Sequence, residues 1–161
     1  MKGTLIFFCG KMGAGKSTRA GAMAGELEAV LLSEDEWLSR LYPDEIRVFD
    51  DYLKYSARIR PLVESLLRAF VDAGVSVVLD FPGNTVGQRA WFRTLIRQTG
   101  AAHRLIYCEA GDELCLGRLA LRRQRQPERA RFDNEAVFRQ VTKYFEPPGD
   151  DEGFHVEVVG E

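Results

Sequence analysis

Apolar residues in this chain form five short runs, and the stretches between them repeat their apolar positions with the period of a helix. The runs cover residues 5–9, 29–32, 75–80, 103–108 and 154–159. Short, continuous apolar runs are typical of strands that are buried on both faces of a parallel sheet. Strands that alternate with helices predict an α/β fold, a single domain over residues 1–161 with helices on both faces of one sheet.

The longest helical pattern, residues 45–73, contains Pro61. Proline cannot donate a backbone hydrogen bond and disfavours helical geometry at the residue before it. We therefore expect a break or kink, with Pro61 opening a second segment that Gly74 ends. The residues of that segment expected to pack on the sheet are Leu62, Val63, Leu66, Leu67, Phe70 and Val71. The first segment is a candidate cover for a substrate site.

Polar residues predict where three further helices begin. Thr85 with Gln88 matches a capping box, and Asp112 and Asp133 each stand where an N-cap is expected. Residues 126–132 are polar and include a proline. This composition predicts a mobile segment between the last two helices.

A phosphate-binding loop follows the first apolar run. Gly10 is separated by four residues from Gly15, Lys16 and Ser17, and a helical pattern over residues 17–28 comes next. Glycines let backbone N–H groups approach an anion closely, and a helix N-terminus adds donors and partial positive charge. A glycine-rich turn without a ligand is the plain alternative. The strand before the motif and the helix after it favour nucleotide binding.

The residues of this loop have distinct expected roles. Lys16 would place its ammonium on the β- and γ-phosphates of ATP as a catalytic group, and Ser17 would bind Mg²⁺. The expected nucleotide contacts are Gly10, Met12, Gly13, Ala14, Gly15, Lys16, Ser17 and Thr18, with Arg118 and Arg122 from a later helix.

Acidic residues follow two of the apolar runs, at the sheet edge where α/β folds bind ligands. Asp35 is the candidate base for an acceptor hydroxyl, and its alternative role is to cap the next helix. Asp80 is a candidate for Mg²⁺ or the acceptor, or it simply begins a turn. Asn84 either contacts substrate or caps a helix. Glu34 and Glu36 are expected to be solvated, and a substrate contact from one of them is the alternative.

Arginines gather near a predicted lid, residues 122–133. The cluster consists of Arg118, Arg122, Arg123, Arg125, Arg129 and Arg131. Guanidinium groups pair bidentately with phosphate oxygens and stay charged, so Arg122 and Arg125 are the candidate catalytic arginines. The alternative is a basic helix end that complements the helix dipole.

The charge composition shows no preference for a class of partner. The chain has 161 residues, with 22 basic and 24 acidic side chains and a net charge of −2. There is therefore no overall bias toward nucleic acid or membrane. Cys9, Cys108 and Cys115 lack the spacing of metal ligands and are expected to be reduced thiols. No signal-type or membrane-spanning segment is recognised, so a cytoplasmic protein is expected.

These features resemble the small P-loop kinases of the AAA-domain ATP-binding type, which are related to polynucleotide 5′-kinases, zeta toxins, chloramphenicol phosphotransferase and gluconate kinase. The resemblance spans nearly the whole chain and rests on residues 10–17, 32–35, 77–80 with 84–85, 121–125 and 145–148. It implies a P-loop NTPase three-layer sandwich with sheet order 2-3-1-4-5, Asp35 as base, and lid contacts from Arg122 and Arg125. The third strand is followed by Asp80-Phe-Pro-Gly-Asn84, and Arg40 comes later than the arginine that many relatives carry. These departures lie where the acceptor is chosen.

The expected function is ATP-dependent transfer of the γ-phosphoryl group to a hydroxyl of a small molecule, with ATP and Mg²⁺ as cofactors. A polynucleotide 5′-hydroxyl is the alternative acceptor, although a near-neutral chain does not favour it. A nucleotide-binding regulator with little turnover is a third possibility. The protein is expected to be a monomer or a homodimer, and Arg40 is a further candidate substrate contact.

Overall fold

Five parallel strands form one sheet at the centre of the molecule. The computed structural model describes residues 1–131, apart from the Arg131 side chain, and residues 133–160. The strand order is β2-β3-β1-β4-β5, which confirms the expected order. The strands are β1 (Leu5–Cys9), β2 (Val30–Ser33), β3 (Val77–Asp80), β4 (His103–Glu109) and β5 (Val156–Gly160). Every neighbouring pair is parallel, so all carboxyl ends meet at one edge.

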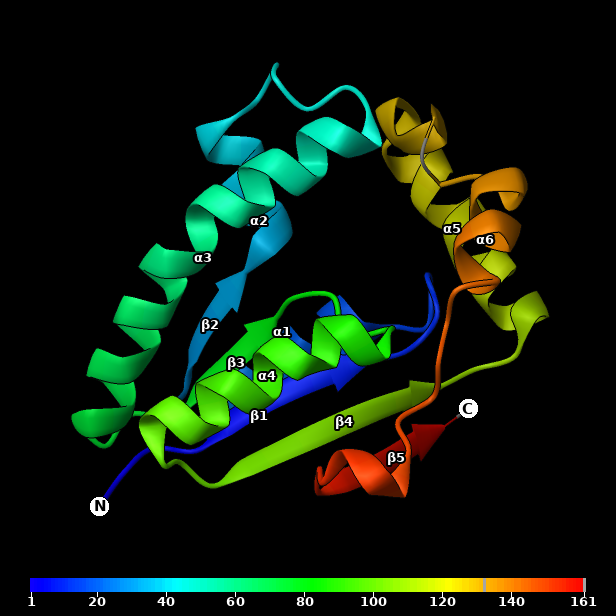
Figure 1. The fold of residues 1–161 in the computed structure, drawn as a ribbon. Helices are drawn as coiled ribbons and strands as arrows, with labels where there is room; N and C mark the ends of the chain where they lie inside the picture. Colours follow the sequence, from blue (N-terminus) through cyan, green and yellow to red (C-terminus); the bar gives the residue numbers. More distant parts are fainter. Residues whose placement is uncertain (132, 161) are drawn as a thin grey trace.

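Helices cover both faces of this sheet (Figure 1). They are α1 (Lys16–Glu26), α2 (Glu34–Leu41), α3 (Phe49–Asp72), α4 (Val86–Thr99), α5 (Asp112–Arg125) and α6 (Glu135–Thr142), with 3₁₀ turns η1 (Pro127–Arg131) and η2 (Asp150–Glu152). In Figure 1, α2 stands on one side of the carboxyl end of the strands and α5 and α6 stand on the other, while the start of α3 lies between them above these ends.

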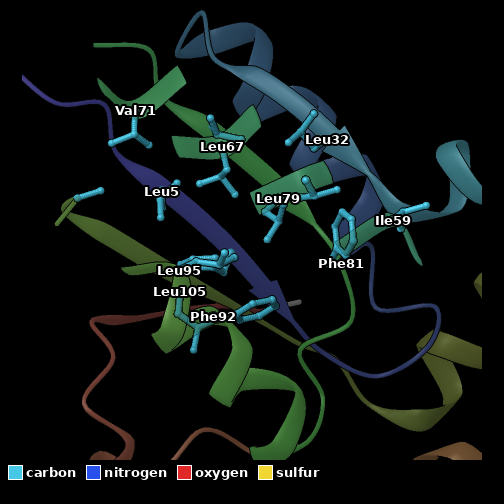
Figure 2. Close-up of a cluster of buried hydrophobic side chains, with 14 of the residues drawn as sticks. Leu5, Leu32, Ile59, Leu67, Val71, Leu79, Phe81, Phe92, Leu95 and Leu105 are labelled. Carbon is cyan, nitrogen blue, oxygen red and sulfur yellow. The ribbon is translucent and has the colours of Figure 1, made fainter. Parts of the chain in front are cut away.

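Successive residues of β1 contribute to two separate apolar cores, because side chains alternate along a strand. Leu5 and Phe7 belong to the core beneath α3 and α4, which Figure 2 shows. Ile6 and Phe8 belong to the core beneath α1, α5 and α6. Burial on both faces explains why this strand reads as a continuous apolar run. The result is the three-layer sandwich predicted from the sequence.

The helix that contains Pro61 is continuous, so the predicted break is wrong. A single helix, α3, begins at Phe49 and runs through Pro61 to Asp72. Ile59 before the proline and Val63 after it are both buried in the same core. This shared burial stabilises helix on both sides of the missing hydrogen bond. The apolar face is also narrower than expected, because Leu62 is 57% exposed.

Several helix starts differ from the predictions by one residue. Asp112 is the first residue of α5 and its carboxylate bonds Lys11, so it is not the cap. Asn134 caps α6 in place of Asp133. Thr85 does cap α4 by accepting from the Gln88 N–H. The segment expected to be mobile contains η1, although Phe132 and the Arg131 side chain lie outside the described residues.

A buried ion pair joins the C-terminal loop to α4. Arg89 is 0% exposed, and its Nε and Nη2 donate to the carboxylate of Glu152 at 2.8 and 3.1 Å. Its Nη1 also donates to the carbonyl oxygen of Gly83 at 2.9 Å. The pair therefore ties the C-terminal loop to α4 and to the turn that follows β3.

Replacing Glu152 with alanine is expected to lower the free energy of unfolding by about 3–5 kcal/mol, because Arg89 would stay buried without its counter-charge. The measurement is urea denaturation at neutral pH. Glu157→Ala is the matched control, because its pair with Arg104 is about one-third exposed on both side chains. That control should cost at most about 1 kcal/mol. Equal losses in the two variants would contradict the special role of the buried pair.

The Arg89–Glu152 pair also makes the free energy of unfolding depend on pH in the acidic range. Burial alone would raise the pKa of Glu152, but hydrogen bonds from Arg89 and the Gly149 N–H hold it below its ordinary value. Because the pKa of Glu152 is lower in the folded protein, the ion pair stabilises the fold at pH values above the ordinary pKa of glutamate. This stabilisation is lost as the pH falls through the lowered pKa. The Glu152→Ala variant should lose this part of the acid dependence.

Within residues 1–131 and 133–160, no helix has both the length and the apolar character needed to cross a membrane.

Candidate functional site

The loop after β1 has the backbone geometry of an anion cradle. Gly13 and Gly15 have φ values of 79° and 93°, which side-chain-bearing residues rarely adopt. A Cβ added at Gly13 would come within 2.7 Å of the Cys115 carbonyl oxygen. Gly15 is also the N-cap of α1, so the free N–H groups of this helix begin where the loop ends. The loop therefore presents donors and positive charge to one point.

Lys16 lies at the centre of this cradle. Its Nζ donates to the carbonyl oxygen of Lys11 at 3.0 Å and also to that of Gly10. Burial lowers the pKa of the Lys16 ammonium, while the nearby Asp80 opposes this shift. A desolvated ammonium gains more from a phosphate than a solvated one does, because charge interactions strengthen when water is excluded. The position fits a phosphate-binding lysine.

Ser17 and Asp80 meet beside the cradle, at the carboxyl end of β3. The Ser17 Oγ donates to Asp80 Oδ2 at 2.9 Å. Burial raises the pKa of Asp80, and the hydrogen bond from Ser17 opposes that rise. A hydroxyl and a carboxylate are the oxygen ligands that Mg²⁺ prefers. These two side chains therefore fit the metal role predicted for them.

Asp35 lies in the first turn of α2 and lines a cavity of about 790 Å³ together with Lys16 and Ser17. The cap of α2 is Ser33, whose Oγ accepts from the Glu36 N–H at 3.3 Å. The alternative role of Asp35 as a helix cap is therefore taken by another residue. The structure brings the predicted base and the P-loop to one cavity.

Asn84 and Arg40 were predicted to contact substrate, and in the structure their side chains bond other residues of the protein. The Asn84 Oδ1 accepts from the Gly10 N–H at 2.9 Å, so this side chain supports the P-loop. Arg40 pairs with Glu36, and its side chain is 78% exposed. Local sequence does not predict the Asn84 contact, because it joins residues 74 positions apart.

The lid arginines are organised by Asp133, which is 1% exposed. Arg122 donates to both carboxylate oxygens of Asp133, at 2.5 and 2.8 Å, and Arg129 adds a bond at 2.7 Å. Burial would raise the pKa of Asp133, but these two arginines hold it below its ordinary value. The side chains of Arg122 and Arg129 consequently line the same cavity as Asp35.

A second cavity, about 640 Å³, also borders the P-loop. Its lining includes Gly13, Gly15, Thr18, Arg118, Arg122 and Arg125. Arg122 borders both cavities. Six of the predicted nucleotide contacts, Arg122 included, therefore lie around this second space, together with the other predicted catalytic arginine, Arg125. Its size suits a nucleoside.

A family model described as AAA domain matches residues 5–148. The chain belongs to this AAA domain family. The AAA domain match covers the phosphate-binding loop, both strand-end acids and the arginine cluster, and it confirms the family predicted from the sequence. No curated protein sequence matches this AAA domain protein.

Solved structures share the fold of this AAA domain protein at low sequence identity. A kinase candidate from Chloroflexus aurantiacus is 18% identical with a TM-score of 0.78, covering 99% of this chain and 89% of its own. The Mycobacterium tuberculosis APS kinase CysC, in complex with AMPPNP and APS, is 17% identical with a TM-score of 0.66, covering 99% and 88%. Chaetomium thermophilum Kti12, in complex with ADP-AlF3, is 14% identical with a TM-score of 0.68, covering 97% and 88%. At this identity the likeness establishes the P-loop kinase fold.

One buried acid of the AAA domain protein was missed from the sequence. Glu34, expected to be solvated, is 2% exposed and accepts from the Tyr52 hydroxyl at 2.6 Å and the Ser56 hydroxyl at 2.7 Å. Burial raises the pKa of Glu34, and both hydrogen bonds oppose this rise. The contact joins α2 to the start of α3. The only signal in the sequence was the i, i+4 spacing of Tyr52 and Ser56, which places both on one helix face.

Proposed function

We propose that this AAA domain protein transfers the γ-phosphoryl group of ATP to a hydroxyl of a small molecule. The observation that supports the proposal is the shared lining of one cavity by Asp35 and the P-loop residues Lys16 and Ser17. A base at this position adjoins the space for an acceptor, and the loop adjoins the space for phosphates. The P-loop kinase fold of its structural neighbours supports the same assignment.

In the proposed reaction, the acceptor oxygen forms a bond to the γ-phosphorus while the bond from that phosphorus to the β–γ bridging oxygen breaks. The bridging electron pair leaves with ADP. The acceptor proton passes to the carboxylate of Asp35, which acts as general base. Lys16 offsets negative charge on the transferred group. Alignment of the two reactants supplies much of the rate increase in reactions of this kind.

Mg²⁺ would be held by Ser17 and, directly or through water, by Asp80. When bound, this ion neutralises charge on the β- and γ-phosphates. The protein contributes the orientation of the donors, because the Ser17 hydroxyl and the Asp80 carboxylate are already 2.9 Å apart.

The proposed charge-stabilising groups of the lid are Arg122 and Arg125. Arg122 is the stronger candidate because it borders both the nucleotide cavity and the cavity of Asp35. Its bidentate pair with Asp133 holds the guanidinium plane in place. A guanidinium that is already oriented loses less side-chain entropy when it binds a phosphate.

Asp80→Asn is expected to raise the Mg²⁺ concentration that gives half-maximal activity by about 10–100-fold. The amide keeps the size of the side chain and can still accept from Ser17, but it removes the negative charge. A magnesium titration at saturating ATP measures the effect. Asp112→Asn is the control, because Asp112 is bound to Lys11 on the far side of the loop. An unchanged magnesium requirement in Asp80→Asn would remove Asp80 from the metal site.

The experiment that tests the function is incubation with γ-labelled ATP, Mg²⁺ and a panel of hydroxyl compounds and oligonucleotides with free 5′-hydroxyls. Label on a small-molecule hydroxyl is the expected result. Label on oligonucleotide ends would replace the small-molecule acceptor. Tight ATP binding with no labelled product from any class would leave a nucleotide-binding regulator and overturn the phosphotransferase.

A further inference from the structure

The part of the Asp35 cavity that lies beyond the P-loop is lined mainly by apolar and aromatic side chains. They are Leu38, Tyr42, Pro43, Ile46, Val48, Phe49 and Tyr52. Val48 is 62% exposed and Phe49 is 70% exposed. Large apolar side chains grouped in this way at a cavity mouth leave apolar area in contact with water, and a ligand that covers them gains the free energy of its removal.

This apolar wall is held in shape by polar contacts behind it. The hydroxyl of Tyr52 donates to the buried Glu34, which fixes one edge of the aromatic ring. The carboxylate of Asp51 accepts from the backbone N–H groups of Arg47 and Val48, at 3.1 and 3.3 Å. Phe49 stacks on Tyr52 with ring centroids 5.9 Å apart. A wall that is ordered before binding loses little entropy when it receives a rigid ligand.

The apolar wall offers an anionic acceptor few cationic partners. Residues 43–51 carry four carboxylates and one guanidinium, that of Arg47. Away from the P-loop and the lid, Arg47 is the single cation in the described lining, and its Nε already donates to the Asp44 carbonyl oxygen at 3.1 Å. The two lid arginines of this cavity, Arg122 and Arg129, are paired with Asp133. The cations of this lining other than Arg47 therefore lie at the P-loop and the lid, and next to the apolar wall an anionic group on the acceptor would find Arg47 alone as a partner among the described lining residues.

We infer that the acceptor is an uncharged alcohol with an apolar, ring-sized body, whose hydroxyl reaches Asp35 while its body lies against Phe49 and Tyr52. The inference rests on the proposed function and specifies its substrate class. Sugars do not match the wall, because their hydroxyl groups would be buried without partners. Nucleotides and 5′-hydroxyl ends of nucleic acids carry several phosphates, whereas the segment that bears the wall, residues 43–51, has four carboxylates and one guanidinium.

The first test compares 3-phenylpropanol with glucose, gluconate and a 5′-hydroxyl oligonucleotide as acceptors of label from γ-labelled ATP. The expected result is a kcat/KM for 3-phenylpropanol about tenfold or more above that for each polar acceptor. A higher kcat/KM for glucose, gluconate or the oligonucleotide would overturn the apolar class and leave the phosphotransferase itself standing.

The second test measures binding without turnover. Calorimetry should detect 3-phenylpropanol binding to the wild-type protein, and Phe49→Ala should weaken that affinity about tenfold, because it removes an aromatic face. Leu53→Ala is the matched control, since Leu53 is 50% exposed on the same helix and outside the described lining of the cavity. Absence of binding, or equal weakening by both variants, would overturn the inference. Binding with this pattern but no labelled product from any acceptor would overturn the phosphotransferase alone.

Discussion

Asp35→Asn is expected to lower the rate of phosphoryl transfer by about 10²–10⁴-fold, the usual contribution of a general base. The amide has almost the same shape as the carboxylate but cannot accept the acceptor proton. ATP affinity should change little, because in the proposed reaction Asp35 contacts the acceptor and not the nucleotide. Single-turnover kinetics with the identified acceptor measures the rate, and calorimetry with ATP and Mg²⁺ measures the affinity.

Glu36→Gln is the matched control for this variant. Glu36 lies next in sequence, and its carboxylate pairs with Arg40 at the surface, where it is 57% exposed. Transfer in Glu36→Gln should remain close to that of the wild type. If Asp35→Asn instead loses ATP affinity in proportion to its rate, Asp35 supports the structure or the metal and is not the base.

Lys16→Ala is expected to reduce kcat by about 10²–10³-fold, the typical cost of removing one preorganised charge-stabilising donor. The same change should weaken ATP binding about 10–100-fold, because a charge-assisted hydrogen bond to phosphate is lost. In the wild type, the Nζ of Lys16 is held between the carbonyl oxygens of Gly10 and Lys11, beside the phosphate position. Nucleotide titration and steady-state kinetics measure the two effects.

Lys11→Ala separates the charge of Lys16 from the general positive charge of the loop. Lys11 belongs to the same loop, but its Nζ pairs with Asp112 at 2.8 Å and points toward α5. The Lys11 variant should keep ATP affinity within a few-fold of the wild type. Full activity in Lys16→Ala would refute the phosphate-binding role of the loop and, with it, the proposed reaction.

The two acids that follow strands, Asp35 and Asp80, show which site residues could be predicted from the sequence. Parallel strands must place their carboxyl ends at one edge, so a residue just after β2 and one at the end of β3 were predicted to lie near the P-loop. Asp80 does bond Ser17, and Asp35 does line the cavity of Lys16. The burial of Glu34 could not be predicted in this way. Glu34 lies one residue from Asp35 in the same acidic run, but it is buried because Tyr52 and Ser56 of α3 close over it.

Asp133 and Pro61 are two further residues whose roles could not be predicted from the local sequence. As a residue before a helical pattern, Asp133 was predicted to be a cap, but two arginines from preceding segments surround its carboxylate. Pro61 was predicted to open a second segment after a break or kink, but burial of Ile59 and Val63 in one core keeps α3 continuous. In both cases the local preference was overcome by contacts from residues that only the folded chain brings close.

The amino-acid sequence by itself determined the alternation of strands and helices, the phosphate-binding loop and the edge at which its chemistry is concentrated. These features depend on residue spacing within one element, and that spacing is visible in the linear chain. Only the tertiary structure decided which neighbouring acid is buried, which carboxylate pairs with Arg122 and Arg129, and which apolar side chains line the cavity of Asp35. Those outcomes depend on side chains from distant elements meeting in space, where burial and charge are set by packing and not by position in the chain.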